Sequence, residues 1–113
     1  MPNKNERRKN PRVEIIWPID VDTDQGTIEG ETRNISISGL YTYCEETLQL
    51  NKIYRLVVYP HNRVEMGVTG KVVWSESYDL DDEPRRVCIG IEIEGISDED
   101  RKFLYYLTKT SKE

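Results

Sequence analysis

Hydrophobic and polar residues alternate along most of the chain, which is the pattern of β-strands with one buried face. Between residues 13 and 21 the hydrophobic side chains all fall on one side: Val13, Ile15, Trp17, Ile19 and Val21. Shorter or interrupted alternation continues over residues 27–37, 40–43, 53–59, 64–74 and 87–93. The pattern therefore predicts six strands, and Pro18 predicts an edge or a bulge in the first of them.

The hydrophobic period changes after Gly95. Ser97 precedes three acids at 98–100, which is the signature of a helix start with a serine cap and a negatively charged first turn. Phe103, Leu104 and Leu107 then form a helical stripe that can pack on a sheet. We predict a helix over about 97–110.

Six short antiparallel strands followed by one helix predict a mainly β fold, a split or closed six-stranded barrel with the helix at one end. The length of 113 residues suits one domain. We expect residues 13–113 to form this domain and residues 1–12 to form a flexible basic arm. In the fifth strand Trp74 shares the parity of Val72, so alternation alone favours a core position for it.

The charge is divided unevenly between this arm and the rest of the chain. Residues 1–12 carry five basic residues and one acid, a charge of +4, so the remainder must carry −9 to reach the net charge of −5. An acidic body argues against a surface that follows DNA or RNA phosphates. The longest apolar runs are four residues or fewer, which argues against a membrane span, and residues 1–20 lack the apolar core of an export signal. We expect a cytoplasmic protein with its two cysteines reduced.

Residues for catalysis are scarce. The one histidine, His61, follows a proline in a turn, and Ser36 and Ser38 have no recognisable base in the sequence. No glycine-rich phosphate loop or zinc signature is present. We therefore expect no enzyme activity, no catalytic residue and no metal site.

Two stretches have the chemistry of a binding site. Arg7, Arg8 and Arg12 carry guanidinium groups that match phosphate oxygens and the O6/N7 edge of guanine in a bidentate way. Asn34 and Ser36 offer hydrogen bonds, and the turn that ends at Gly39 could expose backbone N–H groups to an anion. Taken separately, a basic arm is more often a solvated tail and such a turn more often an ordinary bend.

Together, the two stretches resemble the PilZ family, receptors for the bacterial second messenger cyclic di-GMP (c-di-GMP). Arg8-x-x-x-Arg12 precedes the first predicted strand, and Asn34-x-Ser36-x-x-Gly39 follows about 20 residues later at a bend. The family pairs an Arg-x-x-x-Arg motif with an Asp/Asn-x-Ser/Ala-x-x-Gly motif in this order. The resemblance extends from about Arg7 to the terminal helix.

The resemblance implies that Arg8 and Arg12 clamp guanine edges and phosphates, with Asn34, Ser36 and Gly39 as the floor of the site on the barrel. An arginine at position 7 goes, in the family, with an intercalated pair of c-di-GMP molecules. Trp74 resembles a strand tryptophan that contacts a base in some members. No other cofactor is implied.

We expect a stand-alone bacterial receptor or adaptor, in which the arm closes over the ligand and a protein effector reads the result. It is expected to be a monomer without DNA, RNA or membrane partners. The alternative is an adaptor of the same fold that binds a protein through its basic arm without nucleotide. An oligonucleotide-binding barrel ranks third because the body is acidic.

Overall fold

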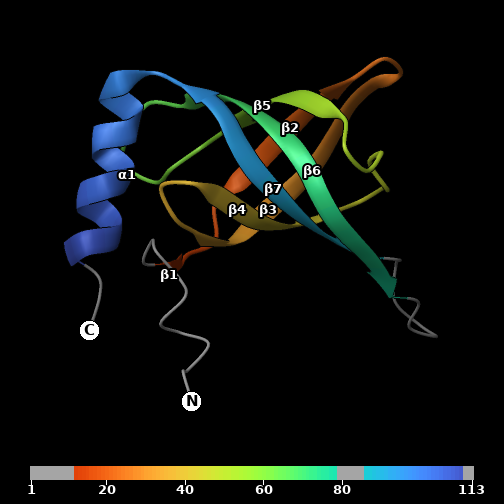
Figure 1. Cartoon of the computed structure of the whole chain (residues 1–113), viewed down its shortest axis with the longest axis horizontal. Helices are drawn as coiled ribbons and strands as arrows, with labels where there is room; N and C mark the ends of the chain where they lie inside the picture. The colour runs from red at the N-terminus through yellow and green to blue at the C-terminus, as the bar shows by residue number, and fades with distance from the viewer. Residues whose placement is uncertain (1–11, 79–85, 111–113) are drawn as a thin grey trace.

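A computed structural model describes residues 12–78 and 86–110, which contain seven strands and one helix (Figure 1). The strands are β1 (Val13–Glu14), β2 (Pro18–Thr23), β3 (Gly26–Ile35), β4 (Gly39–Cys44), β5 (Ile53–Val58), β6 (Met66–Tyr78) and β7 (Arg86–Ile96). The helix α1 spans Asp98–Thr110. Of the predicted arm only Arg12 is described, so the division at residue 12 stays a prediction.

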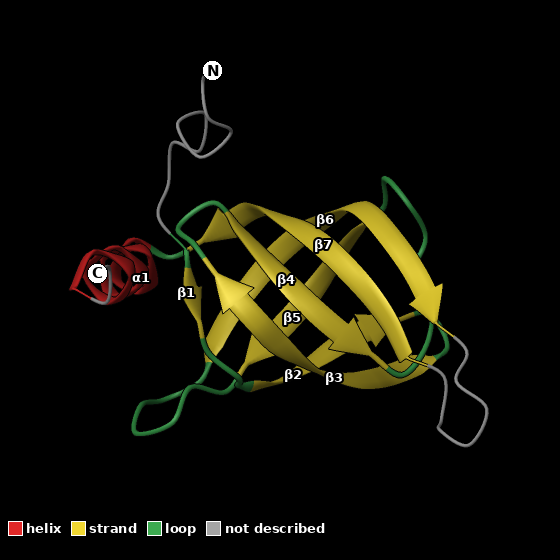
Figure 2. Ribbon diagram, turned by 90° about the horizontal axis from the view of Figure 1, so that it is seen from below, coloured by secondary structure: helices red, strands yellow, loops and turns green. Residues whose placement is uncertain are grey.

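Six of the strands form a closed antiparallel barrel (Figure 2). Their order is β3-β2-β5-β6-β7-β4, and β4 pairs with β3 again to close the ring. The short β1 lies outside this ring and pairs with the end of β3. The predicted barrel of six strands is confirmed, in its closed form and with one extra short strand.

The first predicted strand is divided into β1 and β2. Glu14 pairs with Asn34 and Pro18 with Glu31, so this segment has one residue more than the facing part of β3. The hydroxyl of Thr32 fits into the gap, accepting from the Trp17 N–H at 2.9 Å and donating to the Ile15 carbonyl at 2.7 Å. Pro18 therefore becomes the first residue of a strand, a position where its missing N–H is tolerated.

The barrel interior is hydrophobic, as the alternation predicts. Every barrel strand contributes buried side chains, including Ile19, Ile35, Leu56, Val72 and Ile89. This core fixes which face of each strand is turned outward, and the candidate site lies on that outward face.

The helix α1 lies at one end of the barrel, beside β1 (Figures 1 and 2). Its Ser97 cap accepts a hydrogen bond from the Asp100 N–H at 3.0 Å, as predicted. Leu104 is fully buried in the core, and the Phe103 ring stacks on Trp17 with the centroids 6.1 Å apart. The Arg63 guanidinium lies over the ring of Phe103 in the helix, and its Nη2 atom pairs with Oδ1 of Asp100 at 2.9 Å. Within the described ranges, no helix is long and apolar enough to cross a membrane.

Candidate ligand-binding site

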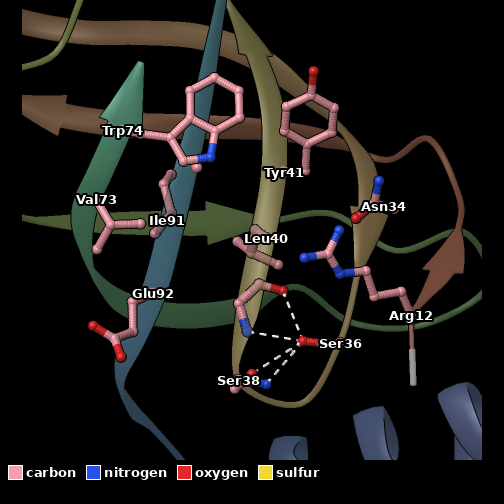
Figure 3. A pocket seen from close by; sticks show the side chains of 12 residues that line it. Arg12, Asn34, Ser36, Ser38, Leu40, Tyr41, Val73, Trp74, Ile91 and Glu92 are labelled. Atoms are coloured by element: carbon pink, nitrogen blue, oxygen red, sulfur yellow. Dashed lines mark hydrogen bonds between the residues drawn. The ribbon is translucent and has the colours of Figure 1, made fainter. Parts of the chain in front are cut away.

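A pocket of about 470 Å³ lies on the outside of the barrel, across β6, β7, β4 and β3 (Figure 3). Its size is within the usual range for small-molecule sites, roughly 300–1,000 Å³. The structure brings five of the predicted site residues to its lining: Arg12, Asn34, Ser36, Gly39 and Trp74. The two others, Arg7 and Arg8, lie outside the described residues.

Asn34 reaches the pocket because β3 contains a bulge. Thr32 pairs with Thr42 and Asn34 with Tyr41, so Arg33 is an extra residue in the strand. Strict alternation from the buried Thr32 would turn Asn34 inward. The bulge instead places Asn34 at the pocket and keeps Ile35 in the core, in the way that bulges often redirect side chains at functional sites.

A second bulge has the same effect on Trp74. Val72 pairs with Ile91 and Trp74 with Gly90, which leaves Val73 as the extra residue of β6. Val72 is fully buried, whereas Trp74 is 42% exposed. The core position that alternation favours for Trp74 is therefore wrong, because the strand changes parity one residue before it.

The Trp74 indole lies over Gly90. A Cβ atom at Gly90 would be only 2.9 Å from Trp74 Nε1, so the ring could not take this position above any larger residue. Tyr41 pairs with Gly90 from the other side, and its ring centroid is 5.5 Å from that of Trp74. The two aromatic rings lie next to each other and form one edge of the pocket (Figure 3).

Ser36 shapes the turn between β3 and β4. Its hydroxyl oxygen accepts hydrogen bonds from the N–H groups of Ser38 and Gly39, each at 3.1 Å. The Ser36 N–H donates to the Gly39 carbonyl at 2.9 Å. The interpretation of this turn as a nest for an anion is therefore wrong, since the two N–H groups already have an acceptor within the turn.

Gly39 allows β4 to approach β7 closely. A Cβ atom there would lie 2.8 Å from the Ile91 carbonyl oxygen, which belongs to the backbone of β7. On the preceding residue, the Ser38 carbonyl accepts the Ile93 N–H at 2.9 Å. The glycine of the motif is thus required by close packing of two strands at the floor of the pocket.

Ser36→Ala is expected to lower the free energy of unfolding by about 1–2 kcal/mol, because two backbone N–H groups lose their acceptor. Chemical denaturation measures this change. Ser75→Ala, which removes an exposed hydroxyl from β6, is the matched control and should unfold like the parent chain. Equal stability of both variants would contradict the role given to Ser36.

Three polar side chains in the pocket remain available to a ligand. Arg12, Asn34 and Glu92 make no side-chain hydrogen bond or ion pair with any other described residue. The Arg12 guanidinium points into the pocket from the β1 side, and Glu92 lies at the β7 side (Figure 3). The pocket therefore combines a cation, an amide, a carboxylate and an aromatic edge.

The sequence motifs did not include Tyr41, Gly90 or Glu92. Gly90 could be noticed as a break in the alternation of β7, but only the strand register shows which aromatic residue covers it. Away from the pocket, Cys44 and Cys88 are both free and buried, and burial raises the pKa of the Cys44 thiol.

Comparison with known protein families identifies the family of this chain. A family model for the PilZ domain matches residues 6–109, nearly the whole chain. The chain belongs to the PilZ domain family. The predicted resemblance is therefore confirmed at the level of the family. No curated protein matches this PilZ domain chain in a sequence comparison.

Solved structures of other proteins share the fold. The PilZ domain of YcgR from Escherichia coli with c-di-GMP superposes with a TM-score of 0.74, at 11% identity and over 93% of each chain. A longer YcgR structure, also with c-di-GMP, gives 0.75 at 10% identity over 93% of this chain and 46% of that one. The Bacillus subtilis inhibitor of motility MotI/DgrA gives 0.74 at 16% identity over 98% and 56%. This PilZ domain thus spans about half of those two longer proteins.

Proposed function

We propose that this PilZ domain is a receptor for c-di-GMP, which binds in the pocket of Figure 3. The observation that carries the proposal is the convergence of Arg12, Asn34 and Trp74 on one pocket, two of them through β-bulges. A pocket with an exposed indole and a guanidinium that pairs with no described residue suits a ligand that has both phosphates and purine bases. Two of the similar structures contain c-di-GMP, which is consistent with this ligand.

Each residue has a separate part in the proposed complex. Arg12, together with Arg8, binds phosphate oxygens or the O6/N7 edge of guanine. Trp74 stacks on a base, and Asn34 supplies an amide for a polar group of the ligand. Ser36 holds the turn at the floor of the pocket by accepting the Gly39 N–H, and Gly39 lets β4 approach the backbone of β7 closely.

The arm with Arg7 and Arg8 is proposed to close over the bound ligand. This closure neutralises part of the arm's positive charge with the ligand phosphates. It also creates a new surface to which an effector protein binds. The domain acts as a receptor and adaptor and carries out no chemistry. We also propose that Arg7 favours an intercalated pair of ligand molecules.

Calorimetric titration of the chain with c-di-GMP tests the proposal. We expect saturable binding with a dissociation constant of about 1 μM or lower, a free energy of about −8 kcal/mol. A stoichiometry of two supports the intercalated pair, and a stoichiometry of one removes that part alone. Absence of binding, combined with an effector that docks equally well without nucleotide, would favour the ligand-independent adaptor instead.

A further inference from the structure

Glu92 is an unexpected residue in a pocket for a phosphodiester. It lies on the outer face of β7, where it pairs in register with Gly39 of β4 and Lys71 of β6. Its side chain is exposed, lines the pocket, and forms no hydrogen bond or ion pair with any other described residue. A carboxylate repels phosphate and only accepts hydrogen bonds. Glu92 can therefore bind the ligand only through a group that donates a hydrogen bond.

The two charges of the pocket lie on opposite sides of it. Arg12 precedes β1, and Glu92 lies on β7, with β3 and β4 between these two strands. Figure 3 shows the Arg12 guanidinium entering from one side and Glu92 at the other. The pocket is therefore polarised, with a donor side at Arg12 and an acceptor side at Glu92.

Guanine has a matching polarity. Its O6 and N7 atoms accept hydrogen bonds, whereas N1–H and the exocyclic N2 amino group donate them. An ionised carboxylate has only acceptors and can receive both donors at once. Adenine has an acceptor at N1, where guanine has a donor, and would face the carboxylate without a hydrogen bond.

We propose that Glu92 determines the specificity of the pocket for guanine by accepting hydrogen bonds from N1–H and N2 of one base. This inference rests on the proposed binding of c-di-GMP and names the residue that distinguishes guanine from other bases. Arg12 then remains available for the acceptor edge or the phosphates.

The position of Trp74 agrees with this role. The indole covers Gly90, and Glu92 lies two residues further along the same face of β7, about 7 Å away along the strand. In the proposed complex, a base that stacks on the exposed indole extends toward the carboxylate. Gly39, the partner of Glu92 on β4, has no side chain that would fill the space beside it.

Titration calorimetry with two ligands isolates this contact. The ligands are c-di-GMP and its inosine analogue, which keeps N1–H, O6 and N7 but lacks the N2 amino group. We expect the parent chain to bind the guanine ligand at least tenfold more tightly than the inosine ligand. Glu92→Ala should bind c-di-GMP roughly 10- to 100-fold more weakly, the effect of a lost charged hydrogen bond, and should no longer distinguish the two ligands.

Glu94→Ala is the matched control, because it removes the same charge from an exposed position of the same strand outside the pocket. It should keep the affinity and the preference of the parent chain. If Glu92→Ala binds c-di-GMP as tightly as the parent chain, or keeps its preference for guanine over inosine, the inference is wrong while the proposed function stands. If the parent chain does not bind c-di-GMP at all, the proposed function itself fails.

Discussion

Replacing Arg12 with alanine is expected to weaken c-di-GMP binding by about 10- to 150-fold, which corresponds to a loss of about 1.5–3 kcal/mol for a charged hydrogen bond. The guanidinium points into the pocket and has no partner among the described residues, so the ligand is its proposed partner (Figure 3). The stability of the chain should not change, because Arg12 is exposed. Titration calorimetry and thermal unfolding measure the two quantities separately.

Two further variants sharpen this prediction. Arg12→Lys keeps the charge but loses the planar fork, so it should recover only part of the affinity. Arg55→Ala removes an exposed arginine of β5 that does not line the pocket, and it should bind like the parent chain. An Arg12→Ala variant with an affinity within twofold of the parent chain would show that the ligand does not use this group.

Gly39→Ala is expected to destabilise the fold by about 1–3 kcal/mol, the usual range for inserting a methyl group where there is no space. The new Cβ would lie 2.8 Å from the Ile91 carbonyl oxygen, and this atom cannot rotate away because it belongs to the backbone. β4 and β7 must move apart, which also disturbs the floor of the pocket and should weaken c-di-GMP binding. Urea denaturation and calorimetry measure these effects.

Gly67→Ala is the matched control for that change. A Cβ at Gly67, an exposed residue of β6, meets nothing within 4 Å. This variant should be as stable as the parent chain or gain about 0.4–1 kcal/mol through the reduced freedom of its unfolded state. Similar stability of Gly39→Ala and Gly67→Ala would contradict the close-packing role of Gly39.

Alternation was sufficient to predict the barrel and its core. It placed Trp17, Ile19 and Val21 on one buried face, and the serine cap located the start of α1 within one residue. It failed where a strand has an extra residue. The bulges at Arg33 and Val73 show only in the register of the pairing with β4 and β7, so the periodicity within each strand contains no sign of them.

The candidate site was only partly predictable for a similar reason. The paired motifs identified Arg12, Asn34, Ser36 and Gly39, and the structure places all four at one pocket. They differ in what they do there: the polar groups of Arg12 and Asn34 have no partner among the described residues, whereas Ser36 and Gly39 build the turn and the strand contact.

The remaining residues of the pocket come together only through the strand register. Tyr41, Trp74 and Gly90 belong to three different strands, and neighbouring positions across a sheet are not encoded by spacing along the chain. Glu92 is one of several exposed acids in the sequence, and only its position beside Gly39 distinguishes it from the others.

The measurement that tests the central claim most directly is an amide-shift titration of the labelled chain with c-di-GMP. We predict that shifts concentrate at Asn34, Tyr41, Gly90 and the indole N–H of Trp74, while the buried indole of Trp17 changes little. Spectra that stay unchanged at millimolar ligand, or shifts confined to the β2 and β5 face of the barrel, would contradict the assignment of this pocket as the c-di-GMP site.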